Sequence, residues 1–212
     1  MKIFDGHSDI WTDVTQRTLK GENNILKKYH LDKLRKGQIE GSIFVIWKDP
    51  YARSMQFVDS IKKELEYCKD SVLIVRSYEN IEKALAENKF YILIGLEGLS
   101  SIGENLDLID FFYDFGARHA SLTWNEENAL ATGTRGNADR GLTELGKKAV
   151  KKINQKNMLM DVSHLNDKSF WDVVNVTDKP IIASHSNCRA LCDVSRNLTD
   201  DQLSKIAEVQ VI

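Results

Sequence analysis

The amino-acid sequence predicts an α/β fold, specifically a (β/α)8 barrel of the TIM type that is truncated in or near its seventh strand. Short apolar runs rich in β-branched and aromatic residues alternate with segments of helical periodicity, which is typical of parallel βαβ units. Seven strand candidates exceed the five or six strands of most open doubly wound sheets, and no glycine-rich phosphate-binding motif follows any of them. These observations favour closure into a barrel over an open sheet.

The strand candidates are expected to be buried, as in most parallel sheets. They are Ile3–Ile10, Ser42–Trp47, Phe90–Leu96, Ala120–Trp124, Met158–Val162, Pro180–Ala183 and a seventh run that begins near Val209. A complete barrel usually needs about 250 residues, whereas this sequence has 212 and contains no linker, charge block or low-complexity tract. We therefore expect residues 1–212 to form a single incomplete barrel domain that lacks its C-terminal strand or strands.

Helix candidates lie between these runs. In Tyr51–Val72, apolar side chains recur every three or four residues, which predicts a helix with one buried face and one charged face. Thr199, followed by Gln202 three positions later, predicts a capping box at the start of the last helix. The other helix candidates are Glu104–Phe115, Thr143–Ile153, the segment after Asn166, and Asp200–Ala207.

Composition and charge exclude several classes of function. Lys and Arg number 29 and Asp and Glu number 31, so the formal net charge of −2 supplies no basic face for nucleic acid. The first residues are too polar for a signal peptide, and no run approaches about 18 consecutive apolar residues, so we expect neither export nor a membrane partner. The cysteines favour the reducing cytoplasm because their number is odd and they lack C-x-x-C spacing: Cys68, Cys188 and Cys192.

Imidazole and carboxylate side chains stand at the downstream ends of four strand candidates. His7 and Asp9 form an H-x-D pair near the end of the first strand, where the two-residue period directs both side chains to one face. Glu97, His164 and His185 each end a later strand. In a barrel these strand ends surround one mouth, where active sites are built. Imidazole and carboxylate are the ligands of catalytic zinc and related metals, so the conjunction predicts a metal centre.

The number of ligands indicates how many ions they hold. Each residue alone has a simpler structural explanation, such as a hydrogen-bonded histidine or a solvated carboxylate. Together they exceed the three protein ligands that one catalytic zinc takes beside its water, and they suit two ions if Glu97 bridges. His7 and Asp9 would then complete one site, and His164 and His185 the other. Two ions about 3.5–4 Å apart can share a hydroxide that attacks a carbonyl, which is chemistry for hydrolysis.

Other polar and aromatic residues carry different expectations. Asp5 lies deeper on the strand of His7, where it either orients an imidazole or anchors the backbone. His30 and His119 are interpreted as surface or loop residues, and the tryptophans mainly as core residues. Trp124 ends the fourth strand candidate and is expected to line the mouth of the active site.

Six short motifs extend over essentially the whole chain: DGHSD at residues 5–9, GLEG at 95–98, SLTWN at 121–125, DVSH at 161–164, ASHSN at 183–187 and SRN at 195–197. In their order and approximate spacing they resemble the membrane (renal) dipeptidase family of binuclear zinc peptidases, in its bacterial-type form. A set of six ordered motifs is far more specific than a lone H-x-D pair.

The resemblance implies a (β/α)8 barrel with two zinc ions per chain, bridged by Glu97 and held by the ligand sets given above. It implies hydrolysis of dipeptides, often with a D-residue at the C-terminal position, and some family members also open β-lactam rings. Arg196 matches the arginine that holds the substrate carboxylate, a task that suits a planar guanidinium. Glu97 and Arg196 are then the catalytic residues, and we expect Trp124 and Asn125 to contact the substrate beside Arg196.

Two departures from the family pattern bear on activity. Trp124 stands where mammalian-type members have a substrate-contacting histidine, which removes a donor for the developing charge. The family aspartate after the eighth strand would lie beyond Ile212. The alternative to an active dipeptidase is therefore a truncated, non-catalytic relative that keeps the metal-binding face. Unpaired strand edges in such a chain would favour homo-oligomers.

A different amidohydrolase-like barrel, acting on cyclic amides or phosphoesters, is a further alternative. Those barrels generally show H-x-H after the first strand and often a bridging lysine after the fourth. Here the first motif is His7-x-Asp9 and the fourth strand candidate ends at Trp124, so the sequence favours the dipeptidase resemblance.

Overall fold

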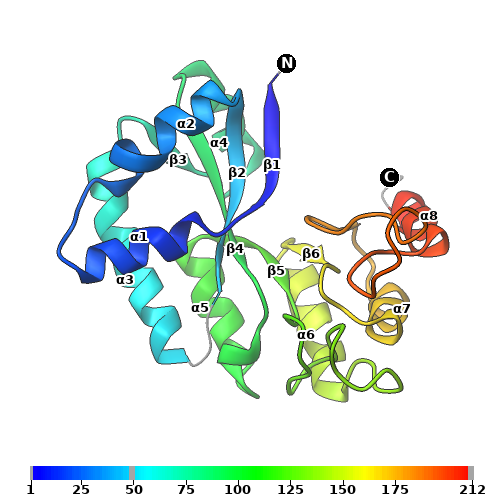
Figure 1. The fold of residues 1–212 in the computed structure, drawn as a ribbon. Helices are drawn as coiled ribbons and strands as arrows, with labels where there is room; N and C mark the ends of the chain where they lie inside the picture. The colour runs from blue at the N-terminus through cyan, green and yellow to red at the C-terminus, as the bar shows by residue number, and fades with distance from the viewer. Residues whose placement is uncertain (1, 48–50, 210–212) are drawn as a thin grey trace. The chain divides into compact units, whose positions relative to one another are not determined.

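The computed structural model describes residues 2–47 and 51–209, in which strands alternate with helices (Figure 1). The chain divides into two compact units. Unit 1 comprises Met1–Leu96 and Asp114–Arg118, and unit 2 comprises Glu97–Tyr113 and His119–Ile212. Each unit contains parallel strands and the helices that connect them.

Unit 1 is built on a parallel sheet with the strand order β1, β2, β4, β3. Helix α1 packs against α3 and β2 (Figure 1), and Trp11 of α1 meets Phe44 of β2 edge to face, with ring centroids 5.3 Å apart. Both rings are fully buried, and burial of such large apolar surfaces is the main stabilising contribution to a core. The elements are β1 (Ile3–Ser8), α1 (Ile10–Leu19), the π-helix η1 (Leu26–His30), α2 (Leu31–Lys36), β2 (Ile39–Ile46), α3 (Tyr51–Cys68), β3 (Val72–Ile74), α4 (Tyr78–Ala86) and β4 (Phe90–Leu96).

Unit 2 contains a second run of parallel pairing, from β5 through β6 to β7. Helix α6 packs against β6 and α7, and Nζ of Lys152 on α6 lies 3.1 Å from Oδ1 of Asp107 on α5. Because the strands are parallel, their carboxyl ends lie at one edge of the sheet, where the loops that follow them can meet. The elements are η2 (Ser100–Ile102), α5 (Asp107–Phe115), β5 (Ala117–Ser121), α6 (Glu144–Gln155), β6 (Leu159–Asp161), α7 (Asp167–Val176), β7 (Ile181–Ile182) and α8 (Asp200–Val209).

The predicted alternation of parallel strands with helices is confirmed, and the predicted strand Phe90–Leu96 has the bounds of β4. The predicted helix Tyr51–Val72 is too long, because α3 ends at Cys68 and Val72 begins β3. A strand of three residues is too short to show an alternating pattern, so periodicity alone does not separate its first residue from the helix.

The predicted boundaries at the two ends of the chain also need correction. The predicted strand Ile3–Ile10 ends at Ser8, and Ile10 begins α1. The prediction that a strand begins near Val209 is wrong for Val209 itself, because this residue is the last of helix α8. The rest of that predicted strand, residues 210–212, lies outside the described residues.

The predicted capping box of the last helix is confirmed. The backbone N–H of Thr199 donates to Oε1 of Gln202 at 2.9 Å, and the N–H of Gln202 donates to Oγ1 of Thr199 at 3.2 Å. Replacing Thr199 by alanine should therefore lower the free energy of unfolding by about 1 kcal/mol, measured by urea denaturation. Thr199→Ser retains the acceptor and should remain close to the parent protein. An equal loss in both variants would contradict a capping role.

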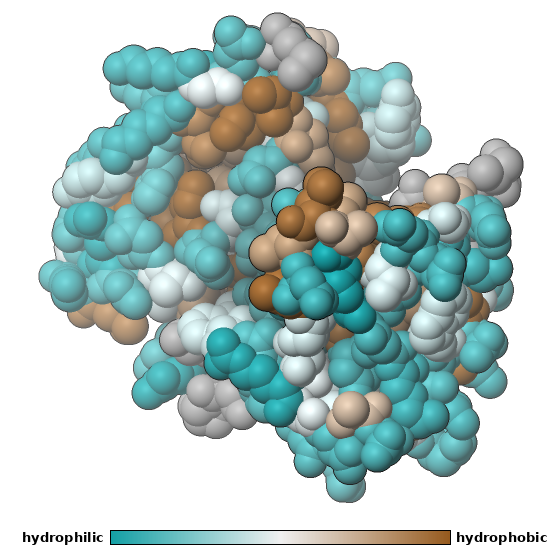
Figure 2. Space-filling view, turned by 45° about the vertical axis from the view of Figure 1, so that its right-hand side comes forward, coloured by the Kyte–Doolittle hydropathy of each residue, from teal (hydrophilic) through white to brown (hydrophobic). Residues whose placement is uncertain are grey.

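The surface carries a few exposed apolar side chains. Phe4 on β1 is 47% exposed, and Leu191, in the loop before α8, is 83% exposed. Figure 2 shows hydrophobic patches between mostly hydrophilic residues on the face in view. The three cysteines form no disulfide. In residues 2–47 and 51–209, no helix combines the length and apolar character that a bilayer crossing requires.

Candidate metal centre

Glu97 directly follows β4, at the carboxyl end of that strand. The next residue, Gly98, donates its backbone N–H to Oγ of Ser121 at 2.9 Å, which ties the segment to the end of β5. Gly98 has a φ of +74°, and a Cβ there would lie 3.0 Å from the backbone nitrogen of Trp124, so glycine suits this turn. Glu97 is thereby held in a buried position, with 7% of its surface exposed.

His164 lies three residues beyond β6 in a strained turn. Its φ of +72° falls in the left-handed region, which is uncommon for residues other than glycine. The carbonyl of His164 accepts the backbone N–H of Thr134 at 3.0 Å, and the N–H of Asn166 donates to Thr132 at 3.0 Å, so neighbouring segments hold the turn. Backbone strain of this kind, about 1–3 kcal/mol, concentrates at functional sites.

His185 lies three residues beyond β7. Its backbone N–H donates to Oγ of Ser163 at 3.3 Å, which places it beside the turn that carries His164. The side chain of His185 is 27% exposed, whereas those of His164 and Glu97 are 7% and 6% exposed. His185 is therefore the most accessible of the three.

The side chains of Glu97, His164 and His185 converge within unit 2. Oε1 of Glu97 lies 2.9 Å from Nε2 of His164 and 3.5 Å from Nε2 of His185. The two Nε2 atoms are 2.8 Å apart. Three of the five predicted metal ligands, from three strand ends, are thus within one coordination shell of each other.

The donor set fits a divalent metal because its acceptor atoms face one another. Nδ1 of His164 lies 2.9 Å from Oδ1 of Asn125, and an amide oxygen can only accept, so Nδ1 carries the proton and Nε2 presents its lone pair. Burial lowers the pKa of His164, and the charge of Arg196 adds to this effect although Glu97 opposes it, so the neutral ligating form is favoured. Nitrogen lone pairs beside a carboxylate oxygen are stabilised by a cation among them.

Arg196 lies in the loop between β7 and α8. Its Nη1 donates to Oγ of Ser186 at 2.7 Å, while its buried Nη2 has no hydrogen-bond partner among the described residues. Burial lowers the pKa of the guanidinium, and the carboxylates of Asp161 and Glu97 act in the opposite direction. The group remains a cation at neutral pH. A buried donor without a partner is unfavourable, so Nη2 marks a place for an anionic ligand atom.

Trp124 and Asn125 follow β5 and lie beside His164. The ring centroid of Trp124 is 6.1 Å from that of His164, and the guanidinium of Arg135 is 6.0 Å from the Trp124 ring. Asn125 also accepts a hydrogen bond from Oγ1 of Thr134 at 3.1 Å, which fixes its amide. The predicted contact of Trp124 and Asn125 with substrate stays a prediction.

His7 and Asp9 belong to unit 1. His7 is partly exposed within β1, whereas Asp9 lies beyond the strand, exposed at the N-cap of α1, so the two-residue strand period does not extend to it. Asp5 accepts hydrogen bonds from the backbone N–H of His7 at 3.3 Å and from Oγ of Ser42 at 3.0 Å, and the first of these anchors the backbone. Metal ligation by His7 and Asp9 stays a prediction.

A buried His–Asp pair was not predicted from the sequence. The interpretation of His119 as a surface or loop residue is wrong, because it is 1% exposed within β5 and its Nε2 lies 3.0 Å from Oδ2 of Asp161. Burial opposes ionisation of Asp161, but hydrogen bonds with His119 and Ser184 hold the pKa of Asp161 below its usual value. The DVSH motif contained a signal, since an aspartate at the end of a buried strand requires polar partners.

Gly133 controls the backbone path of Trp124 and Asn125. A Cβ at residue 133 would overlap the carbonyl oxygen of Trp124 and crowd the carbonyl group of Asn125. Gly133→Ala should lower the free energy of unfolding by about 1–3 kcal/mol, measured by urea denaturation, because backbone must move to admit the methyl group. Gly37→Ala, where the nearest atom would lie at 3.4 Å, is the control. Equal stability of the two variants would contradict this packing argument.

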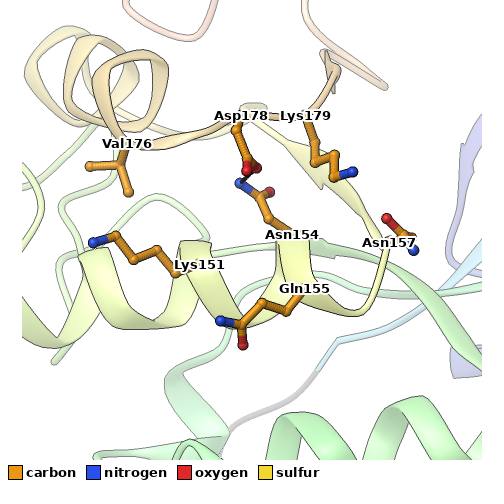
Figure 3. A pocket seen from close by; sticks show the side chains of 7 residues that line it. All are labelled: Lys151, Asn154, Gln155, Asn157, Val176, Asp178 and Lys179. Atoms are coloured by element: carbon orange, nitrogen blue, oxygen red, sulfur yellow. Dashed lines mark hydrogen bonds between the residues drawn. The ribbon is translucent and has the colours of Figure 1, made fainter.

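A separate pocket of about 500 Å³ lies in unit 2 at the end of α6 (Figure 3). Nδ2 of Asn154 points toward Asp178 and donates to its Oδ1 at 3.0 Å. Asn157 and Lys179 precede β6 and β7, so the pocket lies at the amino ends of these strands, away from His164 and His185. Barrel active sites lie at the opposite ends, and the pocket contains none of the predicted site residues.

Comparison with known proteins decides the family. A family model described as Membrane dipeptidase (Peptidase family M19) matches residues 1–212. The chain belongs to the membrane dipeptidase family. Its predicted family is thereby confirmed, and membership supports a peptidase function with a metal cofactor.

Two relatives resemble this chain over most of its length, and one of them is described as a dipeptidase. An uncharacterized protein of the PQQ-III 3' region of Acinetobacter calcoaceticus is 30% identical, over 97% of this chain and 77% of its own length. An uncharacterized dipeptidase of Schizosaccharomyces pombe is 30% identical, over 87% of this chain and 50% of its own length. The chain thus spans half to three quarters of these relatives.

A solved structure confirms the barrel fold class. The metallo peptidase from Rhodobacter sphaeroides, liganded with a phosphinate mimic of the dipeptide L-Ala-D-Ala, matches with a TM-score of 0.89 at 22% identity. The match covers 99% of this chain and 72% of the other. At this identity the match shows that the two proteins share a fold.

Proposed function

We propose that this chain acts as a metal-dependent dipeptidase with zinc as its cofactor. The observation that carries the proposal is the convergence of Oε1 of Glu97 with Nε2 of His164 and His185, at separations of 2.8–3.5 Å. These are two imidazole nitrogens and a carboxylate oxygen, the donor set that catalytic zinc prefers. Membership in the membrane dipeptidase family supports the same reaction class.

The proposal assigns two zinc ions to each chain. His164 and His185 would hold one ion, His7 and Asp9 the other, and Glu97 would bridge them, an assignment supported by the motifs and by the family. When bound, such a centre lowers the pKa of water toward neutrality and polarises the scissile carbonyl. The contribution of the protein is to orient the donor atoms and to bury those of Glu97 and His164.

Arg196 is proposed to bind the C-terminal carboxylate of the substrate. Its Nη1 is anchored on Ser186 and its buried Nη2 is unpartnered in the described residues, so one edge of the guanidinium is available for a charge-assisted hydrogen bond. Trp124 and Asn125 would line the pocket beside it. We propose that the substrate carries a D-residue at its C-terminal position, because the Rhodobacter sphaeroides metallo peptidase, which shares the fold, binds a mimic of L-Ala-D-Ala.

Metal analysis and a dipeptide assay test the proposal together. We expect about two zinc ions per chain after dialysis, and hydrolysis of Leu-D-Ala that is lost on chelation and restored by zinc. Metal binding without turnover would instead support the non-catalytic alternative and contradict the enzyme. Absence of tight metal binding would contradict both. Light scattering would measure the molecular mass and so test the homo-oligomer that unpaired strand edges are expected to favour.

The proposed location is the cytoplasm. It rests on the three cysteines, which form no disulfide and suit a reducing compartment. Of these, Cys68 is buried, and burial raises the pKa of its thiol well above the usual range, so it is unreactive.

A further inference from the structure

Asp161 lies at the end of β6 and is connected through Ser184 to His185, the most accessible histidine of the metal centre. It is 1% exposed, and both of its carboxylate oxygens are hydrogen-bonded. Oδ1 accepts the backbone N–H of Ser163 at 2.9 Å and of Ser184 at 3.2 Å. Oδ2 accepts the hydroxyl of Ser184 and faces Nε2 of His119 at 3.0 Å. A buried carboxylate with this many donors is fixed in its rotation.

The hydroxyl of Ser184 connects this carboxylate to His185. Oγ of Ser184 lies 2.8 Å from Nδ1 of His185. Its single proton is directed to Oδ2 of Asp161, because an ionised carboxylate only accepts and is the strongest acceptor in reach. Ser184 therefore accepts from Nδ1, which must carry the imidazole proton. Nε2 of His185 is then left with its lone pair, and this atom faces Glu97.

We propose that Asp161 is a positioning residue that acts through Ser184 to hold His185 in its Nδ1–H tautomer, so that the lone pair of Nε2 is directed toward the metal site. The inference rests on the proposed function in that it takes His185 as a metal ligand. The Nδ1–H tautomer of His164 is held by a different partner, the amide oxygen of Asn125 at 2.9 Å from its Nδ1. Outer partners of this kind fix the tautomer and orientation of ligating histidines.

Replacing Asp161 by asparagine should reverse the direction of the relay. The backbone N–H groups of Ser163 and Ser184 that contact Oδ1 can only donate hydrogen bonds. In the variant the amide oxygen must therefore face them, and the NH2 group must take the place of Oδ2. Ser184 would then accept from this NH2 group and donate its own proton to Nδ1 of His185. The imidazole proton would move to Nε2, the atom that faces Glu97.

Two measurements follow the relay in the variant and its controls. The 15N resonances of the histidine side chains in metal-free protein report the tautomer of each ring. The signals of His185 are identified as those that disappear in His185→Gln. We expect Nδ1–H in the parent protein and Nε2–H in Asp161→Asn. Zinc titration against a competing chelator should show affinity lowered by about 10–100-fold in Asp161→Asn. Asp178→Asn, whose carboxylate contacts Asn154 in the same unit, should change neither readout.

The possible outcomes separate this inference from the proposed function. A folded Asp161→Asn protein that keeps the parent tautomer and affinity overturns the inference. If Asp161→Asn does not fold, Ser184→Ala is the test variant, because it removes the hydroxyl that connects Asp161 to His185. We expect a mixture of the two His185 tautomers in this variant. An unchanged Nδ1–H tautomer in Ser184→Ala overturns the inference. A parent protein that binds no zinc contradicts the proposed function, while the metal-free tautomer still decides the role of Asp161.

Discussion

Replacing Glu97 by glutamine is expected to lower kcat/KM for dipeptides by a factor on the order of 10²–10³. An amide cannot bridge two cations with two anionic oxygens, and it brings an NH2 group into the cluster of donor atoms. Oε1 of Glu97 lies 2.9 Å from Nε2 of His164, so the substitution acts at the centre of the donor set. The same variant should also lose bound zinc, which elemental analysis measures independently of turnover.

Glu127→Gln provides the control for Glu97→Gln. It makes the same chemical change in the same unit, at a side chain that is 49% exposed and paired only loosely with Arg140 at 3.7 Å. We expect this control to retain zinc and activity, because exposed ion pairs contribute little. Full zinc content and full activity in Glu97→Gln would contradict the assignment of Glu97 as the bridging ligand.

Replacing Arg196 by lysine is expected to lower kcat/KM by about 10²-fold, mainly through a higher KM. A guanidinium can keep the Ser186 hydrogen bond with Nη1 while Nη2 binds a carboxylate, whereas one ammonium group cannot reproduce both geometries. Zinc content should stay at the parent level, because Arg196 donates hydrogen bonds and cannot ligate a cation. Steady-state kinetics with the proposed dipeptides measures the effect.

A dipeptide amide provides the internal control for Arg196. If the guanidinium recognises the terminal carboxylate, the parent protein should strongly prefer the free acid over the amide. Arg196→Lys should reduce that preference and leave the slow hydrolysis of the amide nearly unchanged. An equal loss on both substrates would show that Arg196 supports the fold of its loop and does not bind the carboxylate.

Local chemistry was readable from the sequence where a few neighbouring residues decide the structure. The capping box of Thr199 and Gln202 involves residues three positions apart, so its hydrogen bonds could be predicted without knowledge of the fold. The strand Phe90–Leu96 is a continuous apolar run, and its burial on both faces leaves little ambiguity. Short elements such as β3, Val72–Ile74, lack enough residues to show a period, and they were missed.

The sequence by itself determined which imidazole and carboxylate side chains follow the strands, because residue type and position along the chain are local properties; their ligation of metal stays a prediction. Placing Glu97, His164 and His185 within 3.5 Å of one another required the folded chain, since they are separated by up to 88 positions. Only the tertiary structure decided the relay from His119 through Asp161 and Ser184 to His185. The direction of each hydrogen bond in that relay depends on which donors and acceptors are buried together, and that arrangement exists only after the strands have paired.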